Sequence, residues 1–242
     1  MTELCEGSYK PPSLEKEEDD PKDKEPLTIR MHLLFDGTNN NRTNIAEREK
    51  FEVGEGNDSK AHQQFGTKDS SYDNGLTNIA IMEPHIVDGK DKGGYSFVVK
   101  VYVEGQGTLN LAEDITLRGK ALAIFESGIY RRARKGIDDA FNILVKFLDK
   151  KSPKRYFIKQ VDIDVFGFSR GAATARHAIH VMTTGETIAN HPLLLERFRL
   201  RGYAGMSKKR IKIVFAGLYD TVVSVNASQL APAWLANNAR DQ

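Results

Sequence analysis

The sequence has one cysteine, Cys5, and no hydrophobic run long enough to span a membrane. A single cysteine cannot form an intramolecular disulfide, so the fold is not expected to depend on oxidation. A transmembrane helix needs about 20 mostly apolar residues, so no transmembrane segment is expected. No apolar segment follows a basic start, which excludes the pattern of a conventional secretory signal peptide. If the protein reaches another compartment, we expect a different route of export.

Neither sign of charge is in excess, since 35 Lys and Arg residues stand against 33 Asp and Glu residues. Domains that bind nucleic acids generally carry a strong basic excess, so we expect no nucleic-acid partner. The sequence also contains no recognisable motif for a cofactor or a metal ion. We therefore expect the protein to use neither.

Charged residues are concentrated at the amino-terminal end. Residues 1–26 are rich in Lys, Glu, Asp and Pro and contain almost no large apolar side chains. This composition is typical of a disordered arm. Residues 27–242 are long enough for one α/β domain with a sizeable core. We therefore predict a charged arm followed by a single domain.

Apolar segments of strand type and helix type alternate along this domain. Strands are predicted at residues 27–35, 95–103, 156–166 and 211–216, and helices at residues 77–82, 129–148 and 172–182. Such alternation predicts an α/β fold, with a mostly parallel sheet and helices on both faces. Residues 41–75 are polar and rich in glycine, and we expect a long loop with little regular structure there. Asp162 and Asp164 interrupt the third strand, and we expect them near its entry, where water reaches.

The third strand leads into Gly167-Phe168-Ser169-Arg170-Gly171, which has the form G-x-S-x-G and is followed by small residues. This pattern is typical of a nucleophile elbow, the sharp strand-to-helix turn that exposes a serine in α/β-hydrolases. Glycines flank such a serine because strand and helix come close together there. The alternative is an ordinary glycine-rich turn. We predict that Ser169 is a nucleophile.

Each predicted parallel strand ends in a glycine-containing turn with a polar residue: Asp36, Glu104, Ser169 and Asp220. The carboxyl ends of parallel strands meet at one edge of the sheet, where ligands bind. Asp220 follows the strand after the elbow, which is the position of the acid in a Ser-Asp-His triad. The alternative for Asp220 is a turn or N-cap residue. For Asp36 and Glu104 a structural role is favoured.

An oxyanion hole needs two backbone N–H groups. The first is predicted to be that of Arg170, directly after the nucleophile, and the second that of Gly37 or Thr38, after the first strand. The Arg170 side chain has two candidate partners, a buried carboxylate or a substrate phosphate. The basic clusters at residues 131–135 and 208–210 are expected to be solvated surfaces, with contact to anionic lipid headgroups as the alternative.

The general base is harder to place, because none of the six histidines follows the predicted acid. His177 and His180 lie on a predicted helix about 12 and 16 Å beyond Ser169 along its axis, too far for a hydrogen bond. His85 and His191 lie in predicted loops and could in principle reach the site. By chain order, the histidine of a triad is missing from its expected place.

Four segments taken together resemble the catalytic domain of the type VI secretion phospholipase effectors of the first lipase-effector family, once filed as a domain of unknown function. The segments are Leu34–Asn40, Tyr102–Thr108, Gly167–Ala173 and Gly217–Val222, and the resemblance extends over about residues 28–226. It implies an α/β-hydrolase fold. It also implies a Ser-Asp-His triad that cleaves acyl esters of membrane phospholipids, with Ser169 as nucleophile and Asp220 as acid.

The resemblance further implies a route and partners. Such effectors pass from the cytoplasm of the producer to the periplasm of a target cell through a contractile injection machine, without a signal peptide. A secretion-machine component and an immunity protein are therefore expected partners.

In that family the triad histidine and the lipid-binding insertions lie further along than this sequence extends. The chain therefore looks like the front portion of such an enzyme: a truncated gene, a split product or a degenerate copy. Two functions stay open. One is an active serine ester hydrolase, and the other is a catalytically inactive fragment or non-catalytic binding or cargo module with the same fold.

Overall fold

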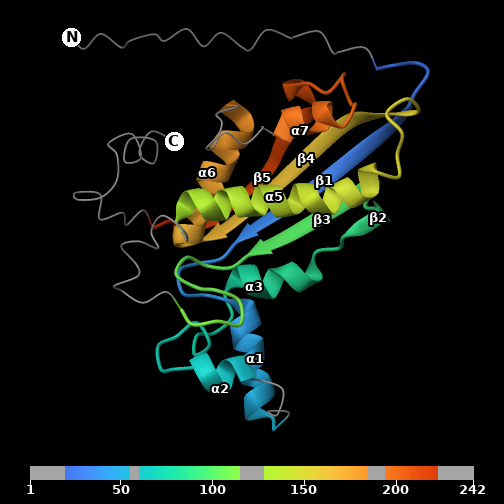
Figure 1. Ribbon diagram of the computed structural model, residues 1–242. Coiled ribbons are helices and arrows are strands. Elements are labelled where there is room, and N and C mark those ends of the chain that lie inside the picture. Colours follow the sequence, from blue (N-terminus) through green and yellow to red (C-terminus); the bar gives the residue numbers. More distant parts are fainter. Residues whose placement is uncertain (1–19, 55–59, 115–127, 185–193, 223–242) are drawn as a thin grey trace, which may run out of the picture.

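The computed structural model describes residues 20–54, 60–114, 128–184 and 194–222 (Figure 1). Its centre is a five-stranded sheet with the order β2-β3-β1-β4-β5. The strands are β1 (Glu25–Phe35), β2 (Gly89–Lys92), β3 (Tyr95–Val103), β4 (Tyr156–Phe168) and β5 (Ile211–Tyr219). β2 pairs antiparallel with β3, and the other pairs are parallel. The predicted mostly parallel sheet is confirmed. Most of the predicted charged arm lies outside the described residues.

The helices alternate with these strands. They are α1 (Arg42–Glu52), α2 (Lys60–Phe65), α3 (Asn78–Met82), α5 (Ile129–Leu148), α6 (Arg170–Thr184) and α7 (Leu194–Leu200), with the short 3₁₀ turns η1 (Glu83–His85) and η2 (Lys208–Arg210). α5 coincides with the helix predicted from the apolar spacing. α6 begins at Arg170, directly after the serine of the G-x-S-x-G pattern.

α1 and α2 occupy the segment that was expected to have little regular structure, so that expectation was wrong. Asn41 caps α1 by accepting hydrogen bonds from the N–H groups of Thr43 and Asn44 at 3.0 and 3.3 Å, which the first turn of a helix leaves without partners. The Asn44 amide donates to Ser71 Oγ at 2.8 Å and to the Leu109 carbonyl at 2.9 Å. A helix held by polar contacts of this kind shows no apolar residues at regular helical spacing in its sequence.

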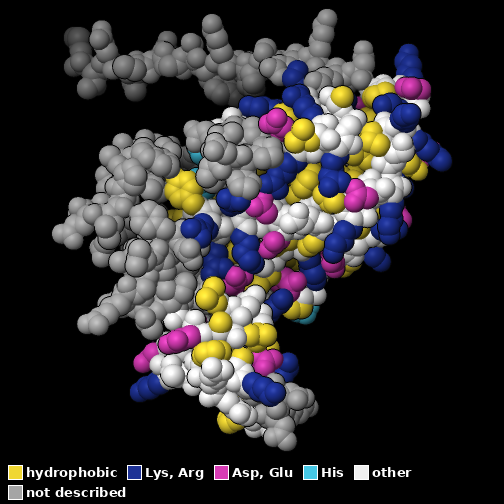
Figure 2. Space-filling model, in the orientation of Figure 1, with side chains coloured by type: hydrophobic (Ala, Val, Ile, Leu, Met, Phe, Trp, Pro, Cys, Tyr) yellow, Lys and Arg dark blue, Asp and Glu magenta, His cyan; other side chains and the backbone are white. Residues whose placement is uncertain are grey.

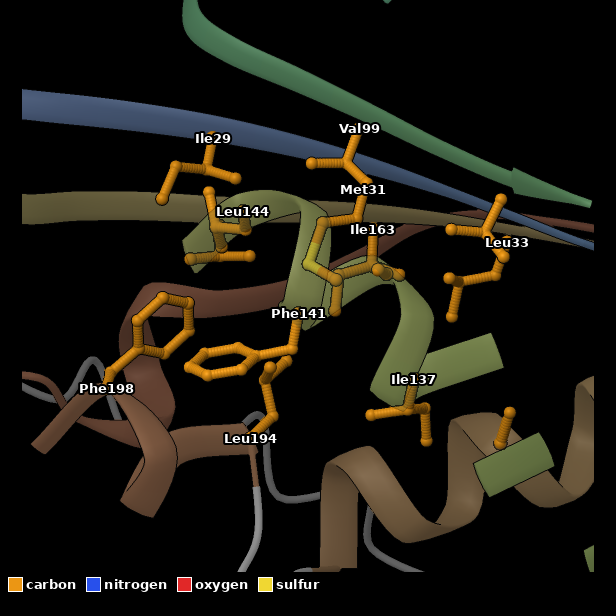
Figure 3. Close-up of a cluster of buried hydrophobic side chains, with 14 of the residues drawn as sticks. Ile29, Met31, Leu33, Val99, Ile137, Phe141, Leu144, Ile163, Leu194 and Phe198 are labelled. Atoms are coloured by element: carbon orange, nitrogen blue, oxygen red, sulfur yellow. The ribbon is translucent and has the colours of Figure 1, made fainter. Parts of the chain in front are cut away.

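The hydrophobic core lies between one face of the sheet and helices α5, α6 and α7. Alternate residues of β1, among them Ile29, Met31 and Leu33, are fully buried on this face. Leu144 of α5 projects toward them, while Phe141 of the same helix lies against Phe198 of α7 (Figure 3). Each large apolar side chain buried in this way contributes roughly 1.5–3 kcal/mol. This layer therefore supplies much of the driving force for folding.

Smaller elements cover the second face of the sheet. Val99 and Val101 point into the main core, so Lys100 between them points to the other side. Its ammonium group donates to the main-chain carbonyls of Glu83 and Ile86 at 3.3 and 2.9 Å, which places η1 on this face. The prediction of helices on both faces is confirmed.

Two carboxylates are buried in the middle of β4, so the expected placement of Asp162 and Asp164 near the strand entry was wrong. Their exposed fractions are 4% and 2%. Asp164 accepts hydrogen bonds from Arg30 Nε and Nη2 at 2.7 and 3.1 Å, and His32 Nδ1 lies 2.9 Å from its Oδ2. Asp162 accepts from the Tyr95 hydroxyl at 2.7 Å. Side chains of β1 and β3 thus replace water around both carboxylates.

The partners of Asp164 make its charge pH-sensitive. Burial alone would raise the pKa of Asp164, but the hydrogen bonds and charges of His32 and Arg30 outweigh it and hold the pKa below its usual value. A carboxyl group with a lowered pKa in the folded state stabilises the fold above its unfolded pKa. That stability is lost as the pH falls through the folded value.

Asp164→Asn is therefore expected to lower the free energy of unfolding by about 1–3 kcal/mol at pH 7, because Arg30 loses its charged partner. The variant should also lose less stability than the parent as the pH falls from about 5 to 2. Urea unfolding followed by circular dichroism measures both effects. Asp149→Asn removes an exposed ion pair with Arg201 and serves as the control, with an expected change below about 1 kcal/mol. Parallel acid destabilisation of Asp164→Asn and the parent would contradict this prediction.

Candidate active site

The carboxyl ends of the four parallel strands meet at one edge of the sheet (Figure 1). The register pairs Phe35 of β1 with Val103 of β3 and with Gly167 of β4, and it pairs Phe168 of β4 with Tyr219 of β5. The polar residues that directly follow these strand ends therefore share one edge of the sheet, as predicted. They are Asp36, Glu104, Ser169 and Asp220. This convergence defines the candidate site.

Ser169 occupies the turn between β4 and α6. Its φ angle is 53°, in the left-handed region that non-glycine residues rarely adopt. Its N–H donates to the Tyr219 carbonyl at 2.9 Å, and its carbonyl accepts from the Ala172 N–H at 3.0 Å. Strained backbone of this kind is concentrated at functional sites. A serine on a strand–turn–helix bend is the arrangement that a nucleophile elbow requires.

The two glycines that flank Ser169 are required by close contacts. A Cβ atom on Gly167 would lie 2.5 Å from the Gly171 carbonyl oxygen and 2.6 Å from Ala172 Cα. A Cβ atom on Gly171 would collide with the main-chain carbonyls of Phe35 and Asp36. The G-x-S-x-G spacing therefore follows from the packing of α6 on the ends of β1 and β4.

Asp220 directly follows β5, and β5 is the neighbour of β4 in the sheet. It is exposed and has a φ angle of 45°. Phe168 of β4 pairs with Tyr219 of β5 in the sheet. Ser169 directly follows Phe168, and Asp220 directly follows Tyr219. Neighbouring strands are about 4.8 Å apart, so the two residues lie next to each other at the sheet edge. The Val222 N–H, at 3.4 Å from the Ser169 carbonyl, closes the same turn.

Asp36 is buried and holds the loop that follows β1. Its carboxylate accepts hydrogen bonds from the Tyr102 hydroxyl at 2.6 Å, from Thr77 Oγ1 at 2.7 Å and from the Gly37 N–H at 2.7 Å. Burial raises the pKa of Asp36 although these three donors oppose the shift. Burial likewise raises the pKa of Tyr102, with a further contribution from the charge of Asp36. These contacts agree with the structural role favoured for Asp36.

The loop after β1 packs directly against the elbow. A Cβ atom on Gly37 would lie 2.6 Å from the Phe168 ring. The Gly37 N–H points to Asp36 in this conformation, while the hydroxyl group of Thr38 is buried and has no hydrogen-bond partner among the described residues. Gly37, one of the two candidates for the second oxyanion donor, thus lies beside the serine turn, and Thr38 is the next residue in the chain.

Glu104, at the end of β3, is paired inside the protein. It forms ion pairs with Arg132, which is buried, and with Lys135 at 3.0 Å. Burial by itself would raise the pKa of Glu104, but these two cations hold it below the usual value. Arg134 pairs with Asp138 at 3.2 Å. The cluster at residues 131–135 therefore serves internal ion pairs.

No continuous basic patch is visible on the face shown in Figure 2, where basic and acidic side chains of the described residues are interspersed. In the second basic cluster, Arg210 is buried and pairs with Asp20 at 2.9 Å. Its guanidinium group also donates to the carbonyl of Lys159 at 3.3 Å. These contacts give this arginine a structural role too.

Arg170 is the first residue of α6 and is half-buried. Burial lowers the pKa of its guanidinium group. Its carbonyl accepts from Thr174 Oγ1 at 3.1 Å, and that hydroxyl accepts from Gln106 Nε2 at 3.2 Å. Arg170 is therefore tied to the loop that follows β3.

The described histidines lie at other places in the fold. His32 contacts Asp164 on the second face, and His85 lies in η1. His62 of α2 lies against the rings of Phe51 and Tyr72. His177 and His180 lie along α6, where the His177 ring is 4.3 Å from that of Tyr130. His191 lies outside the described residues.

Within the described ranges, no group of His, Cys, Asp or Glu side chains is arranged to hold a metal ion. No helix in the same ranges is both long enough and apolar enough to cross a membrane.

No protein-family model and no curated protein matches this chain. One solved structure that does match is described as the Tle1 effector bound to the VgrG spike from the type 6 secretion system. It is 23% identical with a TM-score of 0.50, and the match covers 89% of this chain and 42% of that chain. This chain thus spans less than half the length of that neighbour. At this identity the likeness concerns the fold. Together with the parallel sheet and its helices, it shows that the chain has an α/β-hydrolase-type fold.

Proposed function

We propose that the protein is a serine hydrolase of acyl esters, with Ser169 as the nucleophile and Asp220 as the acid. One observation carries the proposal: Ser169 has a φ angle of 53° on a strand–turn–helix bend, and Asp220 directly follows the adjacent parallel strand. A serine presented in this way is accessible to a substrate at the carboxyl edge of the sheet.

The chemistry divides into three roles. The Ser169 hydroxyl attacks the ester carbonyl and gives its proton to a histidine, which Asp220 orients and stabilises once charged. The N–H of Arg170 and an N–H from Gly37 or Thr38 stabilise the negative oxygen of the tetrahedral intermediate. The packing of Gly37 against Phe168 supports this assignment, because it brings the loop to the serine turn.

The substrates and partners follow from the structural neighbour and the sequence resemblance. The neighbour is a type 6 secretion effector bound to the VgrG spike. By analogy, we propose that this protein cleaves acyl esters of membrane phospholipids and binds a component of a secretion machine. Delivery from the producer's cytoplasm to the periplasm of a target cell, and neutralisation by an immunity protein, complete the proposal.

A fluorophosphonate probe is expected to label the folded protein at Ser169, because an activated serine attacks phosphorus as it attacks an ester carbonyl. Labelling should fall to background in Ser169→Ala and persist in Ser152→Ala, whose serine lies before β4 at the opposite end of that strand. Mass spectrometry of the labelled peptide identifies the site. Equal labelling of Ser169→Ala and the parent, or none in a folded parent, would refute the proposed nucleophile.

Asp220→Asn is expected to reduce the rate of ester turnover by about 10²–10⁴-fold, since the orienting carboxylate of a triad is worth that much in serine proteases. Hydrolysis of a p-nitrophenyl ester measures the effect. Asp69→Asn is a matched control, because Asp69 also has a left-handed φ angle, 65°, but belongs to the segment between α2 and α3. Similar rates for Asp220→Asn and Asp69→Asn would exclude Asp220 from the triad.

The second candidate function is a non-catalytic binding or cargo module with the same fold. The observation that favours it is that the described histidines lie elsewhere than beside Ser169 and Asp220. A folded parent that resists the fluorophosphonate and turns over no ester, but binds a purified spike protein, would select this function over the first.

A further inference from the structure

Arg170 is unusual among the cations at the candidate site, because its charge is half-buried without a counter-charge. In the described part of the chain, no carboxylate pairs with its guanidinium group, and burial is the cause of its lowered pKa. A guanidinium group keeps its charge at any physiological pH. Partial loss of water around that charge costs free energy, which an anionic partner would recover.

Of the carboxylates at this edge, Asp220 is exposed and forms no ion pair with Arg170 among the described contacts, and the two buried ones are already engaged. Asp36 accepts hydrogen bonds from Tyr102, Thr77 and Gly37. Glu104 is held by Arg132 and Lys135. Neither therefore neutralises Arg170, so the partner of this arginine is to be sought outside the described protein groups.

The position of Arg170 connects it to the reaction. Its Cα follows that of Ser169 at about 3.8 Å, and its main chain is tied through Thr174 to Gln106 in the loop after β3. It also begins the 15-residue helix α6, whose first N–H groups favour negative charge nearby. An anion bound here lies beside the reacting ester.

We propose that Arg170 binds the phosphate of the substrate headgroup and thereby selects esters that carry a phosphate over neutral esters. The inference rests on the proposed function and names its specificity residue. A glycerophospholipid suits this arrangement, because only the glycerol carbons separate its phosphate from its acyl esters. The planar guanidinium group can donate two parallel hydrogen bonds to one phosphate.

Binding can be tested separately from turnover in full-length Ser169→Ala. The probes are dihexanoyl phosphatidylglycerol, the neutral dihexanoylglycerol and inorganic phosphate, each titrated by calorimetry below any micelle concentration. The phosphate-bearing lipid should bind tighter than the neutral one. Arg170→Gln should weaken its binding by about 10-fold or more, with no change for the neutral lipid. Arg155→Gln, an exposed arginine just before the start of β4, should change neither.

Three outcomes would overturn the inference. The first is equal affinity of the parent for both lipids, and the second is an equal loss for both in Arg170→Gln. The third is binding of inorganic phosphate as tightly as the lipid with the same dependence on Arg170, which would assign a general phosphate site and no headgroup selection.

A second measurement does not depend on the stability of the variant. In ¹⁵N-labelled Ser169→Ala, the Arg170 Nε–H signal should shift when phosphatidylglycerol is added and stay in place with dihexanoylglycerol. An unmoved signal at saturating lipid would also overturn the inference. Fluorophosphonate labelling reports on the hydrolase proposal independently, so headgroup binding without labelling would defeat the catalytic role and leave the arginine site standing.

Discussion

The contact between the first turn of α6 and the end of β1 determines the geometry of the candidate site. Gly171 approaches the carbonyls of Phe35 and Asp36 so closely that a side chain on it would collide with them. With α6 held there and β4 held in the sheet, the chain between them has room only for a sharp bend. Ser169 is the residue at that bend, so the packing of α6 imposes its left-handed φ angle.

Internal ion pairs and hydrogen bonds make the rest of this edge rigid. Asp36 is fixed by Tyr102 and Thr77, and Glu104 by Arg132. Buried carboxylates of this kind contribute little net stability, but removing one partner is costly. They therefore hold the loops after β1 and β3 in one arrangement around the serine turn. Asp36 and Glu104 are therefore already bonded within the protein at this edge.

Among the longer helices, α5 and α6 bury apolar residues and were predicted from the sequence, while α1, held by polar contacts, was not. Spacing of residues such as Phe141 and Leu144 predicted α5, and the glycines around Ser169 predicted the elbow. α1 depends on Asn44, whose partners are distant in sequence. Asp164 was misplaced because its partner Arg30 belongs to the neighbouring strand, and strand order is not encoded in periodicity. The alternation of strands and helices predicted that the candidate site residues share one edge of the sheet. Their hydrogen-bond partners became known only from the structure.

The link between Ser169 and β5 runs through backbone atoms, since the Ser169 N–H donates to the Tyr219 carbonyl. A bond of this type is available to every amino acid except proline as the donor. The distance between Ser169 and Asp220 therefore depends little on which side chains lie around this contact. Side-chain substitutions around Tyr219 can therefore leave this spacing unchanged.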